Sequence, residues 1–349
     1  MPGRSGDWYD ESVPDLELHR VTREDELPRW WRIDDAAMRT DHVALPADPM
    51  SELAPVLAGP LSGKDVELWL AVAEGRDVGC AKLTLALHDN RHVAVLDVVV
   101  DPPSRGVGIG RRLVDAMLGR VRELGRTVVQ SEVSRPIDAA AEPGAPTRLA
   151  QSVGATHADT ELRRMLDLSE QEPPGLVAAL AAAQRMAEGY TIVRWVDHAA
   201  DADLADLAAL MVVMSTDAPH GDLDVEPEIW DAARYRANEA DAAARGRRRF
   251  AVAAREDATG RLVGFSDIGV NLTVPEVGYQ WDTLVHGEHR GHRLGLLMKQ
   301  ANLEQLRSVS PQTRFINTWN GIDNTPMVSV NEALGYRPME VMEEWQLRL

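Results

Sequence analysis

An internal duplication constrains the fold more than any other feature of the sequence. Residues 96–110, LDVVVDPPSRGVGIG, lie over residues 281–295, WDTLVHGEHRGHRLG, at an offset of 185 residues. Upstream, GRDVGCAKLTLAL resembles GRLVGFSDIGVNL at the same offset, and downstream SVGA lies over ALGY. Three matches in the same order indicate that this chain of 349 residues contains two copies of one domain.

Each copy predicts the same order of secondary structure. Short apolar runs joined by glycine-containing turns predict an antiparallel hairpin, and a third strand follows at residues 92–100 and 277–285. Apolar residues at helical spacing predict a helix next, and then a strand, a short helix and a closing strand. We therefore expect an α+β (mixed α/β) fold. Residues 1–168 and 190–349 are the expected domains, and the segment 169–189, which contains Pro-Pro-Gly and an alanine-rich run, is the expected linker helix.

Composition restricts the class of partner. The 37 basic and 55 acidic residues give a net charge of −18, which repels nucleic acid and anionic membranes, so we expect neither as a partner. No apolar run is long enough to span a membrane and no secretory h-region follows Met1, so we expect a cytoplasmic protein. The lone cysteine, Cys80, predicts a buried apolar side chain, and we expect no metal site.

Each copy places a glycine-rich segment between a strand and a helix, where backbone N–H groups and the helix N-terminus favour a pyrophosphate. The two segments are Arg105-Gly106-Val107-Gly108-Ile109-Gly110 and Arg290-Gly291-His292-Arg293-Leu294-Gly295. Arg111 stands where a dinucleotide fingerprint needs glycine, and no Gly-Lys-Ser/Thr of a P-loop follows. Either segment alone is also compatible with a structural turn.

The strand, the glycine-rich segment and the amphipathic helix together resemble the acyl-CoA pyrophosphate loop of the GCN5-related N-acetyltransferase superfamily. The second copy departs from that motif at Arg293, where the motif has glycine. Its residues 318–338 are similar to the family's last CoA-contacting strand and helix, whereas the first copy lacks the asparagines of that region. The resemblance implies two such domains with splayed central sheets, acetyl-CoA or another short acyl-CoA as co-substrate, chemistry in the C-terminal copy and a degenerate N-terminal copy.

The resemblance also implies where the acyl-CoA binds. The two loops, from Arg105 to Arg111 and from Arg290 to Gly295, would hold the pyrophosphate. Val100 and Val285 would pair with the pantetheine arm through their main chains. Asn320 and Asn324 would make polar contacts, with turn formation as their alternative role.

Three residues are candidates for the catalytic chemistry that the family performs. Asp282 is the first candidate base, because neighbouring aromatic residues would partly desolvate its carboxylate. Asp97 holds the equivalent place in the first copy, so bracing of the strand is the alternative role for both. Glu276 is the second candidate base. Tyr336 is the candidate acid, with packing as its alternative role, since Asn331 stands where the family often has a tyrosine.

The acceptor is expected to bind the loop between the first two helices of the second copy. Asp217, His220, Asp222 and Asp224 lie in this acidic segment, which would attract a cationic amine or simply form a solvated face. The sequence thus predicts an N-acetyltransferase for a small, cationic amine, acting as a monomer or homodimer. The alternatives are a non-catalytic acyl-CoA-binding module and an acetyltransferase for protein N-termini or lysines.

Overall fold

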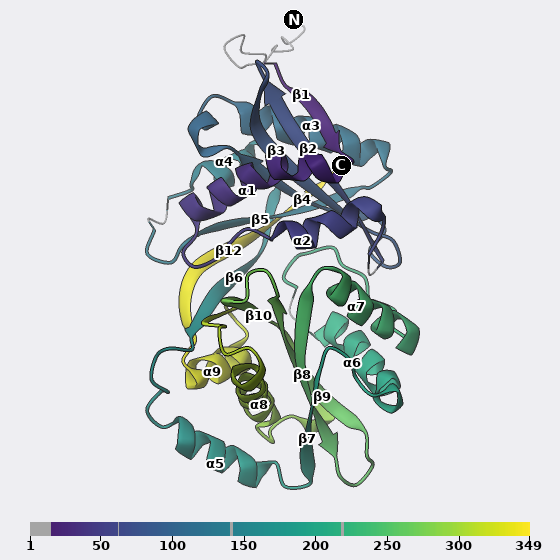
Figure 1. Cartoon of the computed structure of the whole chain (residues 1–349), viewed down its shortest axis with the longest axis vertical. Helices are drawn as coiled ribbons and strands as arrows, with labels where there is room; N and C mark the ends of the chain where they lie inside the picture. Colours follow the sequence, from purple (N-terminus) through teal and green to yellow (C-terminus); the bar gives the residue numbers. More distant parts are fainter. Residues whose placement is uncertain (1–14, 62, 140–141, 218–219) are drawn as a thin grey trace, which may run out of the picture.

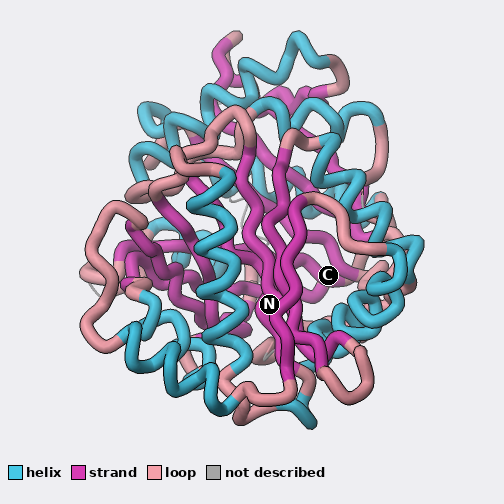
Figure 2. The backbone as a smooth tube through the Cα atoms, turned by 60° about the horizontal axis from the view of Figure 1, so that its bottom comes forward, coloured by secondary structure: helices cyan, strands magenta, loops and turns pink. Residues whose placement is uncertain are grey.

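The computed structural model describes residues 15–61, 63–139, 142–217 and 220–349. Within these ranges a single 12-stranded sheet runs through the whole molecule, in the order β1-β2-β3-β4-β5-β12-β6-β11-β10-β9-β8-β7. Helices cover the sheet on both faces (Figures 1 and 2). The expected mixed α/β fold with two similar halves is confirmed.

The first half follows the predicted order of a hairpin, a third strand, a helix, a strand, a short helix and a closing strand. Its elements are β1 (Glu17–Val21), α1 (Leu27–Asp41), α2 (Met50–Leu53), β2 (Lys64–Ala73), β3 (Arg76–Ala86), β4 (Val93–Val100), α3 (Ile109–Glu123), β5 (Val128–Pro136), α4 (Ala145–Ser152) and β6 (Thr156–Asp167).

The second half repeats this order after α5 (Leu176–Met186), which lies in the segment expected to link the halves. Its remaining elements are β7 (Tyr190–Val196), α6 (Leu204–Asp217), α7 (Ala232–Ala244), β8 (Arg247–Glu256), β9 (Leu262–Asn271), β10 (Val277–Val285), α8 (Leu294–Val309), β11 (Phe315–Gly321), α9 (Thr325–Leu334) and β12 (Arg337–Arg348). No helix among the described residues has the length and apolar character that a membrane crossing requires.

Apolar side chains on the two faces of the sheet form separate cores. In the first half, α3 buries Leu113 and Met117 against one face, and α1 buries Trp30 against the other, where Cys80 is fully buried. In the second half, α8 covers one face, and α6 and α7 cover the face that contains Phe265. Each half is therefore a three-layer unit in which strand ends and loops remain available for a site.

The closing strands of the two halves are exchanged. β12, the last strand of the second half, lies between β5 and β6 of the first half and pairs antiparallel with both. β6, the last strand of the first half, pairs with β11 of the second. Figure 1 shows these two strands running side by side through the middle of the molecule. Each half thus completes the sheet of the other, which the duplication alone does not predict.

Both halves open at corresponding places in the sheet. β4 pairs with β5 only from Val93 to Val95, and β10 pairs with β11 only from Val277 to Tyr279, after which the strands separate. The halves differ in the neighbouring pair of strands. The register of β10 on β9 shifts between Gln280 and Thr283, whereas β4 pairs with β3 without interruption. Only the second half therefore has a β-bulge beside its opening, a feature that often re-aims side chains next to active sites.

Candidate acyl-transfer site

The glycine-rich loops have the same backbone conformation in both halves. Gly106 and Gly108 have φ angles of 84° and 87°, and Gly291 and Arg293 have φ angles of 89° and 59°. Arg293 thus adopts the left-handed conformation that glycine has in the other loop, which few non-glycine residues do. Alternating left-handed residues turn successive N–H groups toward one side, so both loops can form an anion-binding nest.

The first arginine of each loop braces the end of the preceding strand. Arg105 donates from Nε to the Val100 carbonyl at 3.1 Å, and Arg290 donates from Nε to the Val285 carbonyl, also at 3.1 Å. The carbonyls of the two valines expected to contact the pantetheine arm are therefore engaged by these arginines.

Both bracing arginines also carry an acidic partner. Arg105 binds both carboxylate oxygens of Asp41, and Arg290 lies 2.8 Å from Asp217. Asp217, expected to bind the acceptor, is thus paired with the CoA-type loop. Arg293 has no ion pair among the described residues and is exposed, so it is the loop cation that is free to meet a phosphate.

Space beside the loops differs between the halves. In the first half, a Cβ on Gly110 would lie 3.4 Å from Leu149 of α4, and Arg111 donates to the Ser152 carbonyl at 3.0 Å. α4 therefore packs directly against the start of α3. In the second half, a Cβ on Gly295 would meet no atom within 4 Å. The loop of the second half has the more open surroundings.

The remaining loop residues have structural or surface positions. Ile109 and Leu294 are buried at the starts of α3 and α8, whereas Val107 is exposed. His292 contacts the main chain at the end of α5 and packs against the ring of Tyr190. The loops thus offer backbone N–H groups and Arg293, rather than these side chains, to a ligand.

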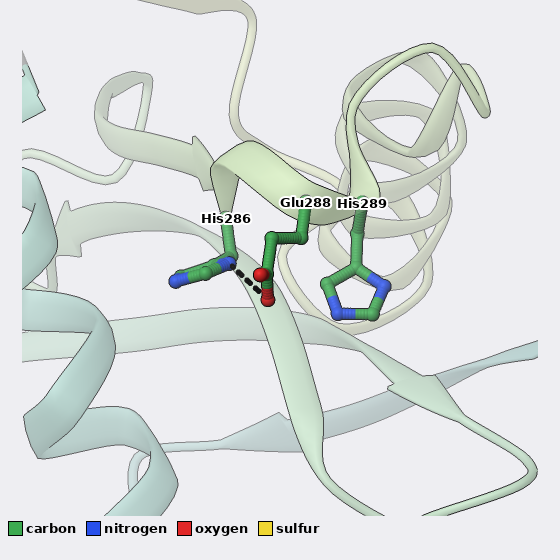
Figure 3. Close-up of side chains that lie close together, drawn as sticks. All are labelled: His286, Glu288 and His289. Carbon is green, nitrogen blue, oxygen red and sulfur yellow. Dashed lines mark ion pairs between the residues drawn. The ribbon is translucent and has the colours of Figure 1, made fainter.

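A small histidine cluster precedes the second loop. Figure 3 shows His286, Glu288 and His289, whose ligand atoms lie within 4.8 Å of one another. Glu288 is exposed, and His289 already lies 2.9 Å from the Tyr190 hydroxyl through Nδ1. The cluster therefore has the character of a surface ion-pair group rather than of a built metal site.

The bulge in β10 brings two carboxylates together. Gln280 and Thr283 pair with the residues on either side of Asp267 in β9, so Trp281 and Asp282 both lie opposite Asp267. Partial burial, and then the negative charge of Asp267, raise the pKa of Asp282 to about 7. The carboxyl group of Asp282 therefore ionises at a higher pH than an ordinary aspartate does.

The first half has an ion pair at the equivalent place. Lys82 lies directly opposite Asp97, with Nζ 3.2 Å from the carboxylate. The matching registers of the two sheets place Lys82 at the position of Asp267 and Asp97 at the position of Asp282. The sequence prediction did not use Asp267, although the duplication already places it over Lys82.

Three aromatic rings form a row beside the bulge. Tyr279 stacks between Trp281 and Trp319, with centroid distances of 5.6 Å and 6.3 Å. Arg247 lies over the Trp281 ring at 5.6 Å. The row provides a flat apolar wall on the face of the sheet that α6 and α7 cover. The sequence prediction missed Trp319, because its place in the row depends on the pairing of β11.

On the same face of the sheet, a group of acidic side chains lies on the exchanged strands and on their neighbour β5. Glu344 of β12 lies opposite both Glu132 of β5 and Asp159 of β6. Desolvation by the surrounding protein and the nearby carboxylates raise the pKa of Glu161 to about 8 and that of Glu132 to about 7. No cation pairs with Glu132, Glu161 or Glu344 in the described ranges. The sequence prediction missed this group because Glu344 arrives from the other half.

The other residues predicted to bind the acceptor fasten their loop to the first half. The Asp222 backbone N–H donates to the main chain of β6 at 2.9 Å, and Asp224 pairs with Arg348 and His92 at 2.5 Å and 3.2 Å. His220 lies 3.2 Å from a carbonyl of α6. The charge of Asp224 is therefore already compensated.

The remaining predicted residues lie away from the bulge or at its edge. Glu276 is an exposed turn residue at the start of β10. Asn324 caps α9, since its side chain accepts a hydrogen bond from the Met327 N–H. Tyr336 is buried, and its hydroxyl has no hydrogen-bond partner in the part of the chain that the structure describes. Asn320 lies on the part of β11 that has separated from β10.

Comparisons with known proteins agree with this geometry. The sequence model of the acetyltransferase (GNAT) family matches residues 28–143. A tandem GNAT protein from the clavulanic acid biosynthesis pathway is 26% identical and has a TM-score of 0.77, with 96% of this chain and 98% of that chain covered. No curated protein matches the chain.

More distant structures share the fold. A GCN5-related N-acetyltransferase from Sphaerobacter thermophilus is 16% identical with a TM-score of 0.65, and 96% of each chain is covered. A putative acetyltransferase from Pyrococcus horikoshii is 11% identical with a TM-score of 0.56, with coverage of 100% of this chain and 94% of that chain. Each of these matches spans both halves, so the duplicated architecture is common to all of them.

Proposed function

Because this chain is a tandem member of the GNAT acetyltransferase family, we propose that it transfers an acetyl group from acetyl-CoA directly to the amine of a small cationic acceptor. The chemistry takes place in the C-terminal half, and the N-terminal half has a supporting role. The observation that carries this proposal is the carboxylate pair at the bulge of β10, which the first half replaces by an ion pair.

The charges at the bulge favour the second half as the catalytic one. A base for an ammonium acceptor works best with a pKa near the working pH, and Asp267 and burial bring the pKa of Asp282 to about 7. In the first half, Lys82 lies 3.2 Å from Asp97, so that carboxylate has a permanent cationic partner. The same backbone position therefore supports a base in one half and a structural ion pair in the other.

The residues of the second half also fit acetyl-CoA. The left-handed pair Gly291 and Arg293 forms a nest at the start of α8, where the helix dipole adds positive charge. The separated strands β10 and β11 offer an edge for the pantetheine arm. Gly295 lies in open surroundings, which leaves room for the pyrophosphate. Acetyl-CoA supplies the activated thioester, and the protein supplies position and a base.

Asp282 takes the proton that the acceptor must lose. An ammonium group cannot attack a carbonyl carbon, so the carboxylate of Asp282 removes a proton, directly or through water, and leaves a neutral amine. The neutral amine then attacks the thioester carbon and the new C–N bond replaces the C–S bond. CoA leaves as a thiolate that takes up a proton, and the amide nitrogen loses its extra proton to solvent. The row formed by Tyr279, Trp281 and Trp319 excludes water on one side and orients the acceptor.

The unpaired carboxylates support a cationic acceptor. Glu161 lies on the same sheet face as Trp319, because Trp319 pairs with Arg163 and Glu161 precedes Arg163 by two residues in β6. Glu132 and Glu344 extend this face, and neither forms an ion pair with another described residue. A positively charged acceptor would stabilise the ionised carboxylates of Glu132, Glu161 and Glu344.

Thiol release from acetyl-CoA in the presence of amines tests the proposal. A panel of diamines, polyamines, amino sugars and neutral amines should give turnover with cationic members first. Asp282→Asn should lower kcat/KM by roughly 10²- to 10⁴-fold and keep the thermal shift that acetyl-CoA causes. Asp97→Asn is the matched control and should keep activity.

Three results would reject the proposal or part of it. Loss of activity in Asp97→Asn but not in Asp282→Asn would move the chemistry to the N-terminal half. Acetyl-CoA binding without thiol release for any amine would favour a binding module. No thermal shift with acetyl-CoA would reject acyl-CoA as co-substrate.

A further inference from the structure

A lysine is buried in the core of the second half without an acidic partner. Lys299 of α8 is 1% exposed. It forms no ion pair within the described residues, and its Nζ lies 5.2 Å from the centre of the Tyr336 ring. Desolvation lowers its pKa to about 7. Burying an ammonium group in this way is costly, so its presence calls for a role beyond packing.

The lysine begins a chain of hydrogen bonds that ends beside the opening of the sheet. Lys299 Nζ donates to Asn331 Oδ1 at 2.5 Å, and Asn331 Nδ2 donates to Asn320 Oδ1. Asn331 is fully buried, whereas Asn320 is partly exposed on β11. β11 has left β10 by this point, since their pairing ends at Asn317.

The chemistry of the ammonium group fixes the direction of this chain. In its protonated form Lys299 has donors and no acceptor, so Asn331 then turns its oxygen toward Lys299 and its amide nitrogen toward Asn320, which is the arrangement in the structure. Asn320 must then turn its own oxygen inward. The Nδ2–H group of Asn320 is left without a partner among the described residues, and Asn320 is partly exposed on the stretch of β11 that has separated from β10.

The first half has apolar residues at all three positions. The repeat offset of 185 residues places Val114 at the position of Lys299. Ala150 matches Asn331 through the common Gly154 and Gly335, and the strand registers place Val133 at the position of Asn320. The same fold is thus built elsewhere in this chain without the polar chain, which argues against a need for it in folding.

We propose that Lys299 is a positioning residue of the acyl-CoA site, which holds Asn331 and Asn320 so that Asn320 Nδ2–H donates a hydrogen bond to a carbonyl oxygen of the acyl-pantetheine arm. This inference rests on the proposed function of the second half. The inference adds a hydrogen-bond donor, Asn320 Nδ2–H, that recognises a carbonyl oxygen of the bound thioester or amide group. It also gives the buried Lys299 the role of fixing the orientation of that donor.

Acetyl-CoA binding by calorimetry tests the role of the cation. The double variant Lys299→Met/Asn331→Leu gives the second half the apolar character of the first. We expect its Kd for acetyl-CoA to rise about tenfold, because the orientation of Asn320 is lost. We expect its melting temperature to equal or exceed that of the wild type, since a buried charge is removed. Val114→Met is the matched control and should change neither value.

A single isosteric substitution of Asn320 tests directly whether this residue offers a hydrogen-bond donor to the ligand. Asn320→Asp keeps an oxygen for Asn331 and replaces only the outward N–H by an acceptor. Its Kd should also rise at least tenfold, because an oxygen would then face the ligand carbonyl. Asn320→Ser, which restores a donor, should recover part of the affinity.

The outcomes separate this inference from the proposed function. Wild-type affinity for acetyl-CoA in both Lys299→Met/Asn331→Leu and Asn320→Asp would overturn the inference and leave the proposed function standing. A double variant that binds normally but melts at a lower temperature would show that the chain of hydrogen bonds is structural. A wild-type protein that does not bind acetyl-CoA would overturn both.

Discussion

One residue difference changes the charge at the two openings of the sheet. Where the first half has Lys82, the second has Asp267, and the partner carboxylate is present in both. A cation at this place favours the ionised partner, and an anion favours the protonated one. Arg249 donates to Asp267 at 2.9 Å, so the buried Asp267 is held in place while it acts on Asp282. Because Arg249 fixes the position of Asp267, the charge of Asp267 can raise the pKa of Asp282.

The rate should therefore depend on the ionisation of Asp282. Because only the carboxylate accepts a proton, log kcat/KM should rise with pH and level off above about 7, the raised pKa of Asp282. Asp267→Asn removes the neighbouring negative charge and should move this acid limb to lower pH by about one unit or more. An acid limb that stays in place in Asp267→Asn, with acetyl-CoA binding intact, would show that another group controls it.

Glu161 should make the folded protein less stable as the pH rises. Its pKa is raised in the folded state from 4.5 to about 8, so the folded state binds more protons than the unfolded state between these values. The free energy of unfolding therefore decreases as pH rises through this window. Between pH 5 and pH 8, Glu161→Gln should gain about 3 kcal/mol in free energy of unfolding relative to the wild type.

Chemical denaturation at several pH values measures this effect. Glu188→Gln serves as the control, because Glu188 is an exposed residue just before β7. A wild-type stability that is flat from pH 5 to pH 8, or an equal response in both variants, would contradict the prediction.

At the scale of elements, the loop between β10 and α8 combines a glycine-like backbone with a free cation. Arg293 has the φ angle of 59° that places it in the left-handed region. Arg293→Gly would keep this conformation and remove one positive charge. We expect the Kd for acetyl-CoA to rise about three- to tenfold, and its dependence on salt to weaken, because one contact to phosphate is lost.

Salt titrations of acetyl-CoA binding measure this contribution. Gly108→Arg makes the reciprocal change in the first half and should leave the affinity unchanged if that half does not hold the co-substrate. An unchanged affinity in Arg293→Gly, or a gain in Gly108→Arg, would place the phosphates elsewhere.

Local patterns in the sequence predicted most elements but not their final neighbours. The duplication gave the order of strands and helices and the place of both loops, because these depend on short-range periodicity. The position of β12 between β5 and β6 depends on pairing between distant segments, so no local pattern contains it. The same holds for Glu344, which faces Glu132 only after the exchange. Desolvation of Asp282 was expected from its aromatic neighbours and is the larger cause of its raised pKa, whereas the second cause, the charge of Asp267, was not foreseen.

At the scale of the whole molecule, the strand exchange joins corresponding sheet faces of the two halves. The face that α1 and α2 cover in the first half continues, through β12 and β6, into the face that α6 and α7 cover in the second (Figure 1). The acidic residues of the exchanged strands therefore lie between the two openings. Under the proposed function, the first half would in this way contribute side chains to an acceptor that reacts in the second.

The exchange should also make the two halves unfold together. Without β12, β5 would expose a bare sheet edge, and without β6 so would β11, so neither half is complete alone. We expect one transition in urea, with the same midpoint by far-UV circular dichroism and by tryptophan fluorescence. Saturating acetyl-CoA should move the entire transition to higher urea, although its proposed site lies in the second half.

Truncation of a β12 side chain tests this coupling most directly. Trp345 is 6% exposed and packs against His157 of β6. Trp345→Ala should cost about 3–5 kcal/mol and shift the single transition as a whole. Phe250→Leu, in the core of the second half, should shift the same transition by a smaller amount. If Trp345→Ala instead produces two transitions, one of them at the wild-type midpoint, the halves unfold independently and the exchanged strands do not couple them.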